Sequence, residues 1–159
     1  MAAEPFLDED YRVLTSEAFD FVLNNELKRA VRSQNFLTLV HVEPTIRGGA
    51  SNNGDRDHAV REIARLVSRD VRETDLIAET RKGRLSLVLL DADMQNSLGV
   101  IERLMSRLEH YGFSRPLAIE FGAACCPTHG ADVESLRRAA ESQPIHPRRD
   151  DRGNASNAH

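Results

Sequence analysis

The sequence predicts an α+β fold with a ferredoxin-like βαββαβ core, a mainly antiparallel sheet and packed helices, preceded by an N-terminal helix. Three observations predict it. Segments with apolar residues at spacings of three and four alternate with short apolar runs, two of those runs meet at a tight turn, and one further amphipathic segment precedes the first run. We expect one sheet with helices packed on one face, and the 159 residues suffice for a domain with its own core.

The first half of the chain supplies a helix, a strand and a second helix. Ser16 is a favourable N-cap residue, and we expect the first helix to run from there to about Arg32. The run 36–42 is apolar and rich in β-branched residues, which predicts a buried strand. The glycines and asparagines of 44–55 predict a loop, and the apolar spacing over about 57–72 predicts the second helix.

A hairpin comes next, with strands expected at 75–80 and 84–90. Its turn carries Arg81, Lys82 and Arg84, and three positive charges repel a divalent cation. A metal-dependent active site on this hairpin is therefore not expected. The remaining elements are a helix from Asp93 or Asn96 to about Tyr111, a strand over 117–125 and a short helix from Asp132 to about Ala140.

Composition excludes several classes of function. The net charge of −4 gives no reason to expect a nucleic-acid surface, and no apolar run approaches the ~20 residues that cross a bilayer. The acidic N-terminus lacks the basic start of a secretory signal, so we expect a cytoplasmic protein. We divide the chain into a flexible start (1–9), one domain (10–141) and a disordered tail (142–159), an arrangement that fits a stand-alone protein.

Cys125 and Cys126 are adjacent at the end of an apolar segment. Adjacent cysteines rarely form a disulfide, so we expect two buried thiols that act as small hydrophobic residues. A redox or metal pair would need companion ligands, and His129 alone does not supply a zinc site.

Four segments in order resemble the GGDEF domain of diguanylate cyclases, over about residues 10–141. They are Leu14-Thr15, Asp75-Leu-Ile-Ala78, Leu85-Ser-Leu-Val-Leu-Leu-Asp-Ala-Asp93 and the stretch from Phe121 to Ala139. The resemblance implies a bacterial signalling domain with this fold, whose active members join two GTP molecules with the help of two metal ions.

The chain departs from the family's pattern at the residues that hold those metals. The signature position carries Arg81-Lys82-Gly83-Arg84-Leu85, so the family's acids fall on a glycine and an arginine. The family's aspartate on the first strand falls on His41, with Glu43 two residues later. Because phosphoryl transfer depends on metals that neutralise charge, we expect no enzyme activity and no metal cofactor. An active cyclase with unusual ligands is the alternative.

Arg72 and Asp75 lie at the spacing of the family's Arg-x-x-Asp pair, five residues before the signature. The resemblance implies that this pair binds the product, cyclic di-GMP, with Arg69 or an arginine of a second subunit completing the site. An arginine fork suits phosphate or a guanine edge, and a carboxylate accepts guanine N–H groups. The alternative is an ion pair at a helix end, and a second copy, Arg148-Arg-Asp-Asp151, shows how common the pattern is.

His41 and Glu43 point to one side of the first strand. They form either a remnant polar site facing the hairpin or a pair satisfied by the loop or by Arg81 and Arg84. The hairpin charges either hold a nucleotide phosphate without metal or form a solvated turn.

These observations predict a catalytically inactive GGDEF-like signalling domain that binds cyclic di-GMP and relays it by protein contact, as a homodimer or with another signalling protein. The alternative function is a ligand-independent dimerisation or interaction module.

Overall fold

The computed structural model describes residues 13–48 and 53–145. The helices are α1 (Ser16–Ser33), α2 (Asn53–Asp70), α3 (Met94–Glu109) and α4 (Val133–Ser142), and the strands are β1 (Leu37–Ile46), β2 (Leu76–Arg81), β3 (Arg84–Leu90), β4 (Leu117–Cys126) and β5 (Pro144–Ile145). The expected flexible start, the second Arg-x-x-Asp copy and most of the expected tail lie outside the described residues. No described helix is both long enough and apolar enough to span a membrane.

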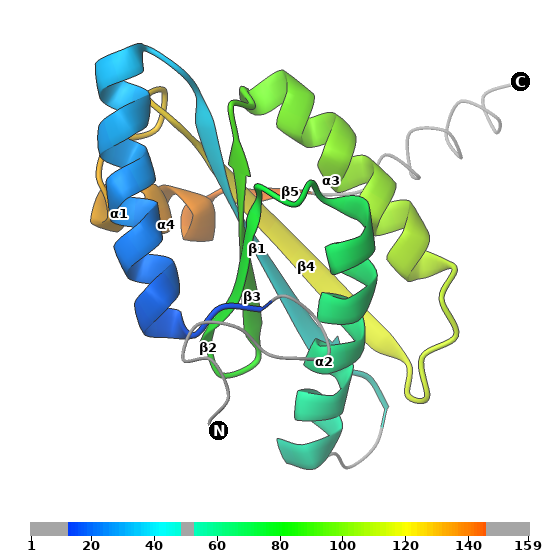
Figure 1. The fold of residues 1–159 in the computed structure, drawn as a ribbon. Helices are drawn as coiled ribbons and strands as arrows, with labels where there is room; N and C mark the ends of the chain where they lie inside the picture. Colours follow the sequence, from blue (N-terminus) through cyan, green and yellow to red (C-terminus); the bar gives the residue numbers. More distant parts are fainter. Residues whose placement is uncertain (1–12, 49–52, 146–159) are drawn as a thin grey trace, which may run out of the picture.

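The strands form one five-stranded sheet in the order β2-β3-β1-β4-β5, with every neighbouring pair antiparallel. β1 lies at the centre, where it pairs with β3 on one side and with β4 on the other (Figure 1). The predicted ferredoxin-like α+β core and the leading helix are confirmed.

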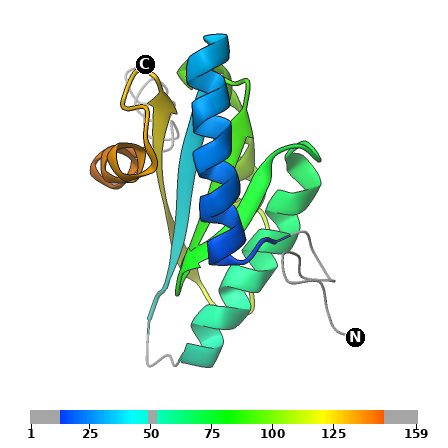
Figure 2. The same ribbon diagram turned by 60° about the vertical axis from the view of Figure 1, so that its left-hand side comes forward.

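Helices cover both faces of the sheet, so the expectation of helices on one face is wrong (Figure 2). One core joins Val40 and Val42 of β1 to α2 and α3. The other joins Leu37 and Leu39 to α1 and α4. Because successive strand residues point to opposite faces, the unbroken burial of residues 37–42 of β1 requires a cover on each side.

Two boundaries differ from the expected loop and tail. β1 continues to Ile46, and α2 begins at Asn53, so the loop is shorter than 44–55. Pro44 is tolerated within β1 because pairing with β3 ends at Val42. The expected tail began at 142, yet β5 pairs with β4 and Ile145 packs against the core, which orders this stretch.

The helix starts follow the capping chemistry of the sequence. Asp93 accepts the N–H of Asn96, and Asp132 accepts the N–H of Ser135, both at 2.8 Å from N to Oδ1. Both predicted caps are confirmed. At α1 the cap is Thr15, one residue before the expected Ser16.

Candidate functional site

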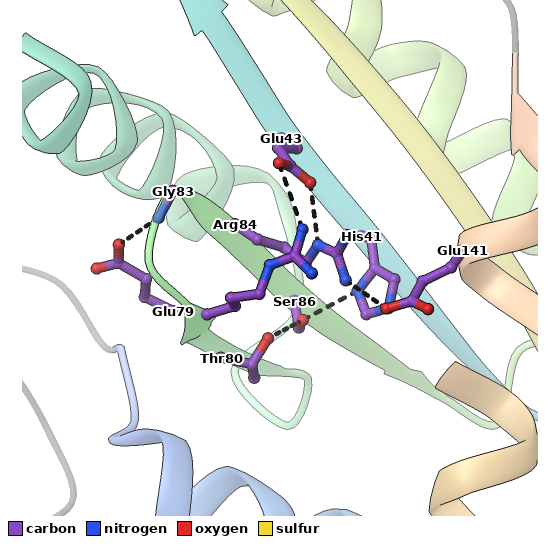
Figure 3. A network of polar contacts seen from close by, with 9 residues as sticks. His41, Glu43, Glu79, Thr80, Gly83, Arg84, Ser86 and Glu141 are labelled. Carbon is purple, nitrogen blue, oxygen red and sulfur yellow. Dashed lines mark hydrogen bonds and ion pairs between the residues drawn. The ribbon is translucent and has the colours of Figure 1, made fainter. Parts of the chain in front are cut away.

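The turn between β2 and β3 places Gly83 against the side chain of Arg56. Gly83 has φ of 86°, a left-handed conformation that favours glycine. Its N–H donates to Oε2 of Glu79 at 3.1 Å (Figure 3). A Cβ at this position would lie 2.9 Å from Cδ of Arg56, which belongs to α2. The position that the resemblance assigns to a metal-binding acid therefore has no room for a side chain unless Arg56 moves.

Arg84 joins the hairpin to two acids from distant parts of the chain. Its guanidinium donates to Glu43 of β1 (Nε to Oε1, 3.1 Å) and to Glu141 of α4 (Nη1 to Oε2, 2.8 Å), as Figure 3 shows. Nη2 of Arg81 lies 3.6 Å from Oε2 of Glu43. Of the alternatives left open above for Glu43, pairing with Arg81 and Arg84 is the one observed. The contribution of Glu141 was missed because nothing in the sequence places α4 beside the hairpin.

The pKa values of this cluster follow from its burial and its pairing. The Arg84 side chain is only 13 % exposed, and burial by itself lowers the pKa of Arg84, but the hydrogen bonds from its guanidinium to Glu141 and Glu43 raise it above the usual value. The hydrogen bond from Arg84 lowers the pKa of Glu141. The cluster is therefore charged on both sides at neutral pH.

His41 lies beneath this cluster as a buried imidazole. Its Nδ1 is 3.0 Å from the hydroxyl of Ser86, which in turn is 2.6 Å from the hydroxyl of Thr80. Within the described residues its Nε2 is buried without a hydrogen-bond partner. Burial, and then the charge of Arg84, lowers the pKa of His41 to about 4, so the ring is neutral at pH 7.

The arrangement leaves little for a divalent ion to bind. The described part of the chain contains no group of three or more His, Cys, Asp or Glu side chains that could hold a metal. The carboxylates of Glu43 and Glu141 already pair with Arg84, and the Glu79 carboxylate of the hairpin accepts the N–H of Gly83. A tethered guanidinium supplies the positive charge here, and a metal would have to displace it.

Arg72 and Asp75 together hold the backbone of Leu90 at the end of β3. The Asp75 carboxylate accepts the N–H of Leu90 (Oδ1) and the N–H of Arg72 (Oδ2), each at 3.1 Å. The Arg72 guanidinium donates to the carbonyl of Leu90 and lies 3.6 Å from Oδ1 of Asp75. The ion pair at a helix end, given above as the alternative, is present, and Asp75 is only 5 % exposed.

A cavity of about 280 Å³ opens beside this pair, between the end of α2, the β3–α3 connection and α3. Its polar lining comes from Arg72, Asp75, Asp70, Asp91, Asn96 and Arg103. Arg69 is exposed on α2 and does not line this cavity. Arg103 could not have been found from the sequence, because only the packing of α3 beside α2 brings it close.

The cysteines take no part in a polar site. Cys125 and Cys126 are buried thiols, as predicted. Burial, and then the neighbouring Cys125, raises the pKa of Cys126. Nδ1 of His129 accepts the N–H of Cys125 at 2.8 Å, so this imidazole closes the turn after β4.

Comparisons with known proteins agree on the fold. No family model matches the chain, and no curated protein matches it. The chain is similar to the FimX GGDEF domain from Pseudomonas aeruginosa, at 14% identity and a TM-score of 0.73, over 89% of this chain and 91% of that one. It is also similar to the GGDEF domain of DgcB from Caulobacter crescentus in complex with c-di-GMP, at 12% identity and 0.69, over 89% and 86%.

A third similar structure contains a protein partner. It is the diguanylate cyclase SiaD from Pseudomonas aeruginosa in complex with its activator SiaC, at 16% identity and a TM-score of 0.67, over 86% of this chain and 55% of that one. Identities this low show a shared fold alone. The chain therefore has the fold of GGDEF domains.

Proposed function

We propose that this chain is a non-catalytic GGDEF-type signalling domain that binds cyclic di-GMP and passes that state on through a protein contact. One observation carries the first part of the proposal: the Arg84 guanidinium pairs with both Glu43 and Glu141. Two-metal phosphoryl transfer needs carboxylates that are available to metal ions, and here Glu43 and Glu141 are paired with an arginine while Glu79 accepts the N–H of Gly83.

The cavity at the end of α2 supports the ligand. Arg72 and Arg103 both line it, and two guanidinium forks suit a phosphodiester. Its volume of about 280 Å³ is at the low end for a ligand pocket, so it accommodates one phosphate or one base and leaves the rest of a dinucleotide outside. A second arginine-bearing surface, such as that of another subunit, would complete the site.

Asp75 has a positioning role in this proposal. Each of its carboxylate oxygens accepts a backbone N–H, one from Leu90 and one from Arg72. Asp75 thereby fixes the first turn after α2, from which the Arg72 side chain reaches the cavity. Arg72 is then the ligand contact, and Asp75→Asn weakens binding through the position of Arg72.

Isothermal titration with cyclic di-GMP tests the ligand. We expect saturable binding that Arg72→Ala and Arg103→Ala both weaken by at least about tenfold, the cost of one charge-assisted hydrogen bond. Arg65→Ala is the control, since Arg65 is exposed on α2, shortly before Arg72 in the chain, and does not line the cavity. No binding at tens of micromolar, or binding that Arg72→Ala leaves unchanged, removes the ligand from the proposal.

Incubation with GTP and magnesium, followed by analysis of the nucleotides, tests the absence of catalysis. We expect GTP to remain and no cyclic di-GMP to form. Accumulation of cyclic di-GMP above a protein-free control would overturn the proposal that this domain is non-catalytic, whatever the titration shows.

A ligand-independent interaction module is the second candidate. It is favoured by the 5 % exposure of Asp75, whose carboxylate oxygens are already engaged by backbone groups. The structure of SiaD with SiaC gives a precedent for a protein partner of this fold. A chain that does not bind cyclic di-GMP yet forms a complex without nucleotide, detected by size or pull-down, supports this second candidate.

A further inference from the structure

The outer edge of β4 is unpaired along Leu117–Glu120 in the part of the chain that the structure describes. On its inner side β4 pairs with β1 along its whole length. On its outer side the described pairing is limited to Phe121 and Gly122, which lie opposite Ile145 and Pro144 of β5. An unpaired edge presents backbone N–H and C=O groups that readily accept another strand.

The opposite edge of the sheet, β2, is protected in two ways. The lead-in to α1 covers it, because Leu14 forms a bridge with Ala78 and donates its N–H to the carbonyl of Ile77 at 2.7 Å. β2 also carries the charged side chains of Glu79 and Arg81, which discourage pairing with another sheet. The segment Leu117–Ala118–Ile119 of β4 has no charge and no such cover among the described residues.

An open cleft of about 740 Å³ adjoins this edge. It is formed by the end of α3, the α3–β4 connection and the start of β4, the yellow strand in Figure 1. Its apolar lining includes Leu117, Ile119 and the Tyr111–Phe113 pair, whose ring centroids are 4.7 Å apart. Partly exposed apolar side chains beside an unpaired strand are typical of a surface that another strand covers.

We propose that this edge pairs with the same edge of a second copy of the chain, about a two-fold axis that passes through Ala118. Such an axis is perpendicular to the sheet, so it makes the two β4 strands antiparallel and keeps equivalent faces on the same side. Each Ala118 then lies opposite its own copy, and Leu117 lies opposite the partner's Ile119. The two five-stranded sheets become one continuous sheet.

The register follows from what the edge already holds. Facing residues must point to the same side, so the axis passes through a residue and not between two. With the axis at Ala118, Glu120 lies opposite the partner's Pro116, no like charges face each other, and pairing stops before Phe121, which β5 occupies. With the axis at Ile119, Leu117 would compete with β5 for Phe121.

A second copy suits this edge because the segment is complementary to itself. Apolar residues meet apolar residues at each of its three central positions, and the two clefts face the same seam. β5 also demonstrates that this edge accepts an antiparallel strand. The proposal does not depend on the function proposed above, since it concerns a different surface and requires no nucleotide.

A charge-swap experiment on the nucleotide-free full chain tests this register. We expect light scattering at about 100 μM to give twice the 17.8 kDa mass of one chain, and dilution to lower that mass. Ala118→Lys and Ala118→Glu each place like charges opposite each other across the axis, so each variant alone should have the mass of one chain. An equimolar mixture of the two should restore the double mass.

Thr74→Lys is the control, since Thr74 is exposed at the opposite edge of the sheet. It should keep the double mass. If the wild-type chain keeps a mass of 17.8 kDa at every concentration, the proposal is overturned. A strand of a different protein would then be the remaining partner for this edge. A double mass that persists in Ala118→Lys alone would place the interface elsewhere and would overturn it equally.

Hydrogen exchange of the wild-type chain provides a test that needs no variant. The backbone amides of 117–120 that point outward should exchange more slowly at high than at low protein concentration, because pairing removes them from solvent. Exchange rates that do not change with concentration in this segment contradict the proposal, even if the Ala118 variants fail to fold.

Discussion

The guanidinium of Arg84 donates to the carboxylate of Glu141 at 2.8 Å, and this ion pair joins the β2–β3 hairpin to α4. α4 is also held by Arg137, which lies one turn before Glu141 and pairs with Asp20 of α1. The positive charge of Arg84 therefore stabilises the packing of the hairpin against α4. It connects β3, α4 and, through Glu43, the central strand.

Arg84→Ala is expected to lower the free energy of unfolding by about 1–3 kcal/mol, because it leaves two carboxylates without their cation and removes a largely buried side chain. Urea unfolding at neutral pH measures the change. Arg81→Ala is the comparison, since Arg81 is 60 % exposed and its pair with Glu43 is longer, at 3.6 Å. Its loss should cost less than about 0.5 kcal/mol. Equal losses in both variants would contradict the structural role of Arg84.

The buried imidazole of His41 predicts a dependence of stability on pH. Burial, and then Arg84, lowers its pKa from 6.5 to about 4, so between these values the unfolded chain binds a proton that the folded chain does not. The free energy of unfolding is highest above pH 6.5 and declines as pH falls toward 4, by about 3 kcal/mol in total, since one pKa unit corresponds to about 1.4 kcal/mol. Urea unfolding at a series of pH values measures this slope.

His41→Gln should flatten that slope, because glutamine does not titrate. The control is His58→Gln, since the His58 side chain is 62 % exposed and lies 3.1 Å from Glu62. If His58→Gln removed the pH dependence of the free energy of unfolding and His41→Gln left it unchanged, His41 would not be its source.

The sequence was sufficient for the order of elements because that order rests on local periodicity and capping, as at Asp93 and Asp132. It also offered the contacts of Glu43 with Arg81 and Arg84 as one of several alternatives, since these residues lie on strands that the fold brings together. Both kinds of expectation need only the local sequence pattern and the assumption that the strands pair as in a ferredoxin-like sheet.

Contacts between elements far apart in the chain were not predictable from that pattern. Glu141 reaches Arg84 only because α4 packs against the second face of the sheet. Arg103 lines the cavity beside Arg72 only because α3 lies next to α2. The extent of β1 was missed for a related reason, since the pairing of Pro44 with β4 overrides its low strand propensity.

Gly83→Asp would place an acid at the position that the resemblance assigns to a metal-binding acid, and we expect it to create no metal site. The positive φ of 86° and the Arg56 side chain at 2.9 Å both oppose it, so we expect a loss of about 1–2 kcal/mol in the free energy of unfolding. Titration with magnesium chloride should release no binding heat, because the Arg56 guanidinium lies beside the new side chain, with Nη1 3.4 Å from its Cβ, and can pair with its carboxylate. A stoichiometric magnesium site in this variant would contradict that expectation.

Gly48→Asp separates the two causes of that loss. Gly48 also has a positive φ, of 64°, but a Cβ there would meet nothing within 4 Å. Its loss should therefore reflect backbone strain alone and be smaller than the loss in Gly83→Asp. The difference between the two variants measures the contact with Arg56.

Gly122 marks the closest approach of α4 to the sheet. A Cβ at this position would lie 2.3 Å from the carbonyl oxygen of Ala140, a backbone atom that cannot turn aside. Gly122→Ala should therefore push α4 away from β4 and cost about 2–3 kcal/mol in thermal or urea unfolding. Gly99→Ala is the matched control, since a Cβ there meets nothing within 4 Å and alanine favours the interior of α3, for a gain of about 0.5–1 kcal/mol. If Gly122→Ala were as stable as Gly99→Ala, α4 could not pack on β4 in this way, and the pairing of Glu141 with Arg84 would lose its geometric basis.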